Sequence, residues 1–513
     1  TVGTPYYFAI SPSADMTVTP VATTEAGLLL TFDYRQRLDH GSYNVELASA
    51  FDEDPENSRS KFRGSVRTKG EFELGSWWKW GWDVTVESDD TFRRFYRLDN
   101  AFATDRVSQL YLEGLHDRNY FSANAYYFGG LTFEDSDQAD SVVFPSIDYN
   151  YIFDNPLLGG ELAFDSHTLV LSRDNGGDVA RTANELKWRR TLVDPLGETF
   201  TPFAQLRGDV YKTTSFNDEK LGDGPQDATT AFRGSAMAGL EYRMPFVKHT
   251  ENATHIIEPI AQIIARPNIE DQGEIPNEDA RSLVFDDTLL FDTDKFSGYD
   301  RIETGTRANV GVQYSVSTTN GWNARVVAGQ SYQIAGDNSF TPDSGLENAN
   351  SDYVAGAYLD FSSNLQLVSQ VRIDQDSLDI KRNDLQLTGA YGPFSGSANY
   401  VNARDQGGLG FEEDREEVIG SAAIQLANHW TLFGDLRYDL ENDDFIRNGI
   451  GLKYADECFV LSVSYAETNV EDDDIKPDQT ILVKYNLLNL GQTEGRTDSI
   501  GLFSSEAPVL DKY

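Results

Sequence analysis

Apolar and polar residues alternate along the first fifty positions of the chain. Leu28, Leu30, Phe32 and Tyr34 fall on one face of an extended segment, because successive side chains of a strand point to opposite sides. The opposite face carries Thr31, Asp33, Arg35 and Arg37. Ionised groups at successive positions of one face, in segments of about ten residues, are typical of tilted strands that cross a membrane. The pattern therefore predicts a transmembrane β-barrel.

The same alternation recurs to the end of the chain, and no stretch with the period of a helix competes with it. At about 20 residues per strand and turn, it predicts an all-β, antiparallel barrel of about 26 strands, closed between its first and last strands. We expect one set of side chains to face lipid: Leu30, Phe32, Val45, Leu206, Leu240 and Val483. We expect a second set to face inward: Asp33, Arg35, Glu46, Arg207, Glu241 and Lys484.

Three indole rings share one face of a predicted strand, at Trp78, Trp80 and Trp82. An indole is apolar but carries an N–H that prefers water, so such a row suits a membrane interface. Aromatic residues make up 12% of the chain, which fits rings lining two interfaces. A packed aromatic cluster in the core of a β-rich secreted protein is the alternative.

Composition narrows the possible classes of protein. Lys and Arg number 42 against 83 Asp and Glu, and the resulting net charge of −41 argues against a nucleic-acid partner. Mean hydropathy is −0.46, and no stretch approaches the roughly 18 apolar residues of a membrane helix. The single cysteine, Cys458, excludes a disulfide framework within the chain. It is either a small apolar residue or the anchor of a disulfide to another domain, and we favour a free thiol.

The sequence offers little for catalysis. The six histidines have no metal-ligand spacing, and no G-x-S-x-G elbow or glycine-rich phosphate loop is present. We therefore expect no enzyme activity, no cofactor and no metal site, although a Ser–His pair assembled by the barrel wall and weak cation binding by acidic loops stay open. The longest irregular stretch, Asn268 to Tyr299, is predicted to fold over or into the barrel.

Two prolines near the start of the chain could weaken one edge of its first strand. Residues an even number apart direct their N–H groups toward the same neighbouring strand, so Pro12 and Pro20 in one strand would remove two donors from one ladder. The alternative is that Pro12 lies in a lead-in and Pro20 at a strand end, where neither matters.

Several stretches together resemble a known family. The opening run Tyr6 to Pro20, Ile257-Glu258-Pro259, the run Phe296 to Glu303 and the last strands around Cys458 are similar to the barrel of the LPS-assembly outer-membrane translocons, the LptD (OstA) family. The family-motif residues are Glu258, Pro259, Gly298, Tyr299, Asp300 and Arg301.

The resemblance implies a barrel of 26 strands in the outer membrane of a Gram-negative bacterium, with a plug lipoprotein of the LptE type in its lumen. It implies a lead-in at residues 1–12 from an N-terminal jellyroll domain that receives lipopolysaccharide (LPS) from a periplasmic bridge protein, a barrel at 13–490 and a tail at 491–513. It also implies that LPS leaves through a lateral gate between the first and last strands, about Ser13–Thr23 and Thr480–Leu490. The expected seam residues are Pro12, Met16, Val18, Pro20, Ile481, Val483 and Tyr485.

In family members, adjacent cysteines form disulfides to the N-terminal domain, and Cys458 stands alone at that position. The function expected is insertion of LPS into the outer leaflet. The alternative is an outer-membrane porin or substrate-specific transporter, which would have about 16–18 strands with a constriction loop, or an N-terminal plug domain.

Overall fold

The computed structural model describes residues 2–22, 27–53, 60–96, 98, 106–130, 141–173, 177–214, 216–218, 223–226, 228–269, 272, 275–280, 283–362, 364–405, 413–470 and 477–487. Within these residues almost all regular structure is β-strand, and the only helix is the short α1 (Phe92–Phe95). None of the described helical structure is long and apolar enough to span a membrane.

The strands of the first half are β1 (Val2–Gly3), β2 (Tyr6–Ser11), β3 (Ala14–Ala22), β4 (Leu28–Leu38), β5 (Gly41–Glu53), β6 (Ser60–Glu73), β7 (Trp78–Glu87), β8 (Arg106–His116), β9 (Asn119–Gly129), β10 (Ser141–Ile152), β11 (Glu161–Arg173), β12 (Val179–Arg189), β13 (Leu192–Val193), β14 (Thr199–Thr213), β15 (Phe216–Asp218) and β16 (Asp223–Gln226). Those of the second half are β17 (Thr230–Arg243), β18 (Phe246–His249), β19 (Ala253–Ala265), β20 (Thr306–Thr318), β21 (Asn323–Ala335), β22 (Tyr353–Ser362), β23 (Leu365–Ile373), β24 (Ile380–Tyr391), β25 (Phe394–Ala403), β26 (Arg415–Ala427), β27 (Trp430–Asp439), β28 (Asp444–Ala455), β29 (Phe459–Thr468) and β30 (Asp478–Leu487).

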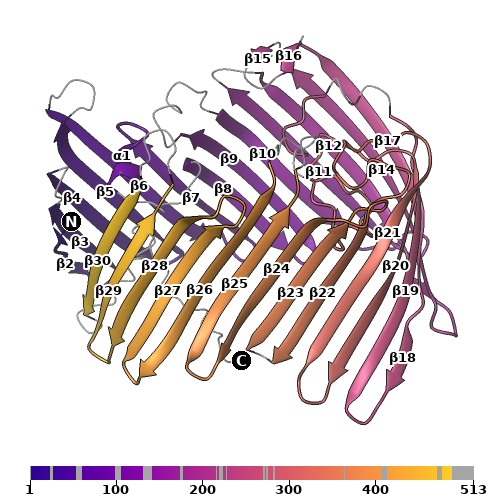
Figure 1. Cartoon of the computed structure of the whole chain (residues 1–513). Coiled ribbons are helices and arrows are strands. Elements are labelled where there is room, and N and C mark those ends of the chain that lie inside the picture. The colour runs from indigo at the N-terminus through magenta and orange to yellow at the C-terminus, as the bar shows by residue number, and fades with distance from the viewer. Residues whose placement is uncertain are drawn as a thin grey trace.

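All strands except the hairpin β15–β16 form one antiparallel sheet of 28 strands, in which the pairing follows the order of the chain. The sheet curls round, so that the indigo first strands and the yellow last strands lie at the same side of the view (Figure 1). The predicted all-β antiparallel barrel fold is confirmed.

Three of the 28 strands continue an interrupted neighbour: β1 and β2 both pair with β3, β12 and β13 with β14, and β17 and β18 with β19. If each interrupted pair is counted as one strand, the described residues form 25 strands in place of 28. The prediction was about 26. Because neighbouring strands alternate in direction and their number is odd, β2 and β30 run in the same direction. An antiparallel pairing that closes the barrel between them would need one further strand beyond those described.

Register separates the two faces of the sheet as the alternation predicted. One row across β3 to β7 is apolar and consists of Val18, Phe32, Leu47, Val66 and Val86. The adjacent row is polar and consists of Thr17, Asp33, Glu46, Arg67 and Thr85. Leu206 and Val483, both predicted to face lipid, expose 60% and 62% of their surface on the outer face. Arg207, predicted to face inward, is 8% exposed, whereas the side chain of Lys484 lies outside those described.

Trp78, Trp80 and Trp82 lie on one face of β7. Trp80 and Trp82 stack with Phe72, at ring-centre distances of 5.4 and 5.8 Å, and Trp82 continues the row to Tyr43 at 6.5 Å. These rings share the face of the apolar row, and the Trp82 indole N–H donates to the Thr68 hydroxyl at 3.0 Å. Trp80 and Trp82 thus belong to a row of contacting rings on the outer face, and the place of the three tryptophans at a membrane interface stays a prediction.

Candidate functional site: a loop held on the inner wall by arginines

The described part of the segment between β19 and β20 (residues 266–269, 272, 275–280 and 283–305) folds against the inner face of the sheet. Side chains of β12, β14, β17, β19, β20, β22 and β23 bond to it, and all of them lie on the polar face of their strands. The prediction that this stretch folds over or into the barrel is confirmed. We call it the inner loop.

Three arginines on neighbouring strands form the main anchor of the inner loop. Arg181 (β12), Arg207 (β14) and Arg233 (β17) are 5%, 8% and 6% exposed, and we call them the arginine cluster. On the wall itself, Asp209 pairs with Arg207 at 2.9 Å and with Arg233 at 2.6 Å. Arg207 also pairs with Glu185 at 3.3 Å. Buried cations need such partners, because removing a charge from water costs several kcal/mol.

The backbone of the motif run occupies the centre of this cluster. The carbonyl oxygen of Tyr299 accepts from Arg207 Nη2 and Arg233 Nη2, both at 2.5 Å, and from the Tyr211 hydroxyl at 2.9 Å. The carbonyl of Asp300 accepts a further bond from Arg233 Nη1 at 2.8 Å. The Tyr299 ring stacks on His167 of β11, with ring centres 4.4 Å apart. One carbonyl oxygen thus satisfies three donors of the wall.

Arg181 is paired only through the inner loop among the contacts of the described residues. Its guanidinium pairs with Asp279 Oδ2 at 2.5 Å and with Asp300 Oδ1. Asp279 in turn accepts from the backbone N–H groups of Tyr299 and Asp300, at 3.0 and 3.1 Å. Burial alone would raise the pKa of Asp279, but Arg181 and these N–H donors outweigh burial and hold the pKa below its usual value. The carboxylate therefore stays ionised opposite Arg181.

A second ionic group anchors the C-terminal end of the inner loop. The Glu303 carboxylate, fully buried, pairs with Arg307 Nε at 2.7 Å and with Arg266 Nη2 at 3.2 Å. Burial alone would raise the pKa of Glu303, but Lys295, Arg266 and Arg307 outweigh it and hold the pKa low. Burial lowers the pKa of the Lys295 ammonium, which is 1% exposed, and raises that of Asp294 to about 6.

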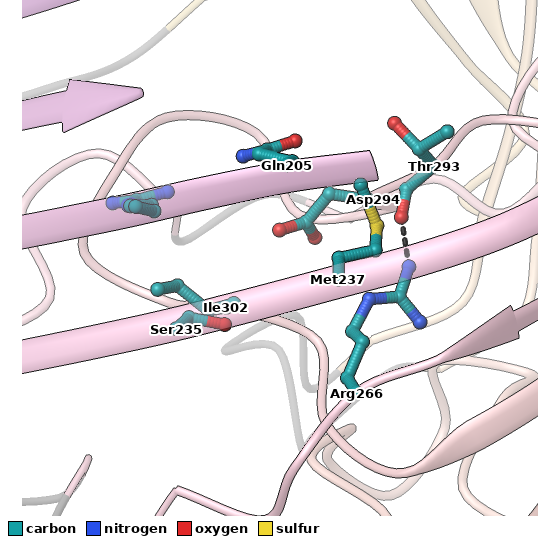
Figure 2. Close-up of a pocket in the computed structure, with 8 residues that line it drawn as sticks. Gln205, Ser235, Met237, Arg266, Thr293, Asp294 and Ile302 are labelled. Atoms are coloured by element: carbon teal, nitrogen blue, oxygen red, sulfur yellow. Dashed lines mark hydrogen bonds between the residues drawn. The ribbon is translucent and has the colours of Figure 1, made fainter. Parts of the chain in front are cut away.

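A small cavity lies between the two anchors (Figure 2). Its volume is about 20 Å³, enough for one water molecule, and Asp294, Met237 and Arg266 are among the residues that line it. Arg266 donates to the Thr293 carbonyl at its edge, which Figure 2 marks with a dashed line. The remaining lining residues are Gln205, Arg207, Ser235 and Ile302.

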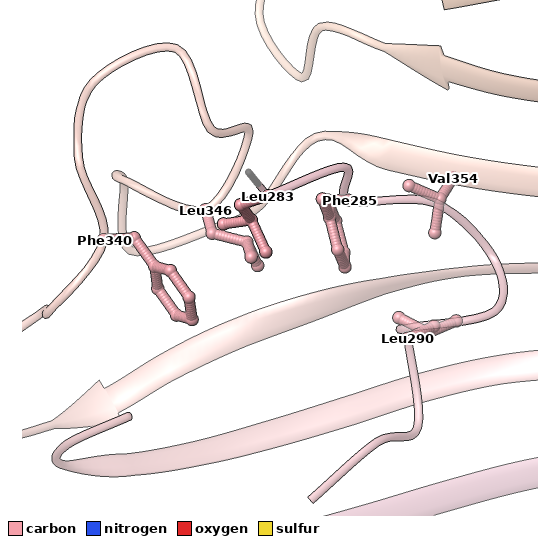
Figure 3. Packing of buried hydrophobic residues seen from close by; sticks show 6 residues of the cluster. All are labelled: Leu283, Phe285, Leu290, Phe340, Leu346 and Val354. Atoms are coloured by element: carbon pink, nitrogen blue, oxygen red, sulfur yellow. The ribbon is translucent and has the colours of Figure 1, made fainter. Parts of the chain in front are cut away.

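An apolar cluster joins the inner loop to the loop between β21 and β22. Leu283, Phe285 and Leu290 of the inner loop meet Phe340 and Leu346 of the second loop and Val354 at the start of β22 (Figure 3). Phe285, Leu290 and Leu346 are fully buried. Ionic anchors and this cluster together fix the inner loop to the wall on both sides.

Of the residues chosen from the sequence, the motif residues Gly298 to Arg301 all lie in the inner loop. Arg301 Nη1 donates to the Ile275 carbonyl at 2.8 Å, which ties two turns of the inner loop together. Glu258 lies on β19 and pairs with Arg243 at 3.3 Å. Pro259 stands opposite the break between β17 and β18, where its carbonyl accepts from Met244 N, so its missing N–H interrupts no ladder bond.

The seam expected from the sequence needs correction. The predicted first strand, now β3, pairs on one side with β1 and β2 and on the other with β4, so Met16, Val18 and Pro20 do not lie on an edge strand. Residues 6–11, expected to be a lead-in, form β2 instead. Pro12 lies in the turn between β2 and β3. The expectation failed because strands of six residues are too short to distinguish from a lead-in by alternation alone.

Near the C-terminal end, β30 pairs with β29, and Ile481 and Val483 are exposed on its outer face. The side chain of Tyr485 and residues 488–513 lie outside those described. Cys458 is an exposed free thiol in the turn between β28 and β29, and its N–H donates to Asp456 at 2.7 Å. It is therefore not a buried apolar residue.

The sequence reasoning identified Arg207 as inward-facing but missed Arg181, Arg233 and Asp279. Arg181 and Arg233 lie at the alternate positions of their strands that face inward, and this alternation could have identified them. Among the described residues, no group of His, Cys, Asp and Glu is arranged to hold a metal ion. The site can bind anionic or polar groups, because its hydrogen-bond donors are guanidinium and hydroxyl groups.

The chain is similar to known proteins over most of its length. The family model described as LptD, LPS transport system D, matches residues 61–409. The LPS-assembly protein LptD of Pseudoalteromonas atlantica is 22% identical over 527 residues, covering 99% of this chain and 67% of that protein. The LPS-assembly protein LptD of Salmonella typhimurium is 23% identical, covering 90% and 62%. The chain thus spans about two thirds of the length of these relatives.

Among solved structures, the siderophore receptor PiuA of Acinetobacter baumannii matches with a TM-score of 0.32 and 9% identity, over 93% of this chain and 82% of the receptor. The ferric-catecholate import receptor Fiu of E. coli matches with a TM-score of 0.30 and 10% identity, over 93% and 81%. These likenesses are too weak to indicate a function.

Proposed function

Because the chain belongs to the LptD family, we propose that it is the barrel of an outer-membrane translocon that inserts LPS into the outer leaflet of a Gram-negative bacterium. The observation that carries the proposal is the family match over residues 61–409, which includes the inner loop and both of its anchors. The substrate is LPS, and the chain supplies a route and a gate, without bond chemistry.

The two faces of the sheet suit an amphipathic cargo. Burying sugar hydroxyls in hydrocarbon costs several kcal/mol for each unpaired group, so the saccharide of LPS needs a polar path. The inner face offers rows such as Thr17, Asp33 and Glu46, whereas the outer face offers rows such as Phe32 and Leu47. A barrel that opens sideways lets sugars follow the inner face while acyl chains stay in lipid.

We place the lateral gate at the N-terminal end of the sheet, where the ladder between β3 and its neighbour is interrupted. Thr4 N–H donates to the Pro20 carbonyl at 3.2 Å, but the reciprocal bond is missing because Pro20 has no N–H. The strand opposite is itself interrupted between β1 and β2, at Thr4 and Pro5. β1 and β2 together match β3 at seven residue pairs, compared with thirteen between β5 and β6. Each absent ladder bond removes about 0.5–1.5 kcal/mol that would resist opening.

The inner loop serves the same function by obstructing the lumen, so that the sideways exit is favoured over passage through the barrel. A plug lipoprotein of the LptE type would fill the remaining lumen. A periplasmic bridge protein would deliver LPS through the jellyroll domain that the family resemblance implies. Both partners are part of the proposal, and family membership is what supports them.

The test is a disulfide staple across the weak ladder, in cells that depend on the full-length protein. Tyr7 and Thr17 oppose each other between β2 and β3, and cysteines at both positions, with Cys458→Ser, should bridge the two strands. We expect the staple to reduce delivery of LPS to the cell surface and a reductant to restore it. The matched control is a staple at Leu47 and Val66, which oppose each other between β5 and β6 and should leave delivery unchanged. Normal delivery with the β2–β3 staple fully formed would show that this end of the sheet is not the exit.

A further inference from the structure

The inner loop places acidic and carbonyl oxygens opposite guanidinium and hydroxyl donors of the wall. Around Tyr299 and Asp300, the wall contributes three buried guanidinium groups and the Tyr211 hydroxyl. The inner loop contributes the carboxylates of Asp279 and Asp300 and the carbonyl oxygens of Tyr299 and Asp300. All bonds across this contact run in one direction, from wall donor to loop acceptor.

The wall charges are not balanced without the inner loop. Asp209 and Glu185 belong to the wall and neutralise Arg207 and Arg233. Arg181 has no such partner on the wall among the described contacts, since both of its carboxylates, Asp279 and Asp300, come from the inner loop. Its Nε is also buried without a hydrogen-bond acceptor. A guanidinium that is 5% exposed and lacks an anion is strongly unfavourable.

We propose that the arginine cluster is a phosphate-binding site on the inner wall, and that the inner loop occupies it as an internal substitute for the ligand. A phosphate group offers several acceptor oxygens and about two negative charges, which matches the two carboxylates around Arg181 together with the multiply bonded Tyr299 oxygen. Arginine forks bind phosphate in a bidentate manner, and Arg181, Arg207 and Arg233 point to one place from three adjacent strands.

The segment that occupies the site is bounded by two glycines in the left-handed region. Gly298 has φ +73° and Gly305 has φ +75°, on either side of Tyr299 to Thr304. Withdrawal of Tyr299 and Asp300 would expose the three arginines to the lumen, and the incoming anion would replace the charges that leave. Loop and ligand therefore compete for one set of donors. That the phosphate is carried by LPS rests on the proposed function, whereas the anion site rests on the contacts alone.

The experiment measures binding to the purified, detergent-solubilised chain. Asp279→Asn with Asp300→Asn removes both loop charges from Arg181, and Asp300→Asn alone is the milder variant if the double variant folds poorly. The probes are phosphorylated lipid A, dephosphorylated lipid A and inorganic phosphate. We expect the double variant to bind phosphorylated lipid A about tenfold more tightly than the original chain, and Arg181→Gln added to it to cancel the gain. The matched control is Asp352→Asn, a loop carboxylate that pairs with Arg372 at 3.5 Å away from the cluster and should give no gain.

The probes separate the possible outcomes. A gain for phosphorylated lipid A alone assigns the site to the glycolipid, and an equal gain for inorganic phosphate assigns it to phosphate groups in general. No gain in either loop variant, an equal gain for dephosphorylated lipid A, or a gain that survives Arg181→Gln would overturn the site. Binding is measured without export, so a failure here does not bear on the lateral gate, and a failure of the β2–β3 staple leaves this result standing.

Discussion

Asp279 lies directly above Gly298, so that a Cβ added to the glycine would lie 2.3 Å from the Asp279 carboxyl carbon. The same carboxylate accepts the N–H groups of Tyr299 and Asp300 and pairs with Arg181. The glycine thus makes room for the residue that organises the inner loop. Its φ of +73° is itself a conformation that side chains with a Cβ rarely adopt.

Gly298→Ala should therefore destabilise the inner loop in two ways, by backbone strain of about 1–2 kcal/mol and by displacement of Asp279. We expect faster cleavage by trypsin after Arg301 in the folded barrel. The control is Gly321→Ala in the turn between β20 and β21, where φ is +86° but nothing lies within 4 Å of the added Cβ. Gly321→Ala introduces the backbone strain without a contact like that between the new Cβ of Gly298→Ala and Asp279. Equal trypsin sensitivity of the two variants would argue against an effect of that contact.

Leu387→Arg should test the outer face of β24. Leu387 is 40% exposed and stands in register with Leu367 and Ala398, and a charge at mid-membrane on the lipid side costs about 2–4 kcal/mol. Gln386→Arg, one residue earlier and on the inner face, should cost much less. Urea unfolding of the two variants in lipid vesicles provides the comparison. A larger loss for Gln386→Arg would reverse the assignment of the two faces.

Asp294 should make the stability of the inner loop depend on pH. Burial raises the pKa of Asp294 from 3.8 to about 6, so the folded protein holds a proton that the unfolded chain releases. This contribution is complete below the unfolded pKa of 3.8 and is lost as the pH rises through about 6. At pH 7 the folded protein holds this carboxyl ionised against the cost of burial, so Asp294→Asn should abolish its dependence on pH and raise the free energy of unfolding at pH 7 by about 1–2 kcal/mol.

The measurement for Asp294 is the unfolding midpoint between about pH 4 and pH 7, in steps of about half a unit around the folded pKa. Burial also raises the pKa of Asp352 to about 6, so some dependence on pH should persist in the Asp294→Asn variant. A slope that is identical in the variant and the original chain would contradict the buried state of this carboxyl.

Cys458 should react with a maleimide in the folded barrel at one label per chain. The thiol is exposed in the turn between β28 and β29, and no second cysteine exists within the chain. Cys458→Ser should change the free energy of unfolding by less than about 0.5 kcal/mol, as expected for an exposed position. Labelling that occurs only after unfolding, or a disulfide-linked dimer of the pure chain, would contradict the exposed free thiol.

The alternation of apolar and polar residues was sufficient to predict the fold class, because in a strand the face of each side chain depends only on its position in the local sequence. Phe32 and Asp33 could be assigned to opposite faces on that basis, and Arg207 to the inner face. The stretch from Asn268 was predicted to fold over or into the barrel because it is long and irregular. These statements require no knowledge of distant contacts.

The tertiary structure alone decided what the inner loop binds and where the sheet ends. Arg181 and Asp300 are 119 positions apart, and their pairing depends on the curvature that brings β12, β14 and β17 around the motif run. The alternation within a strand does not identify such partners, since the same strand could face many different segments across the barrel. The edge of the sheet was misplaced for a similar reason. β3 is an edge strand only if the six residues of β2 do not pair with it, and the sequence of such a short segment does not determine whether it pairs.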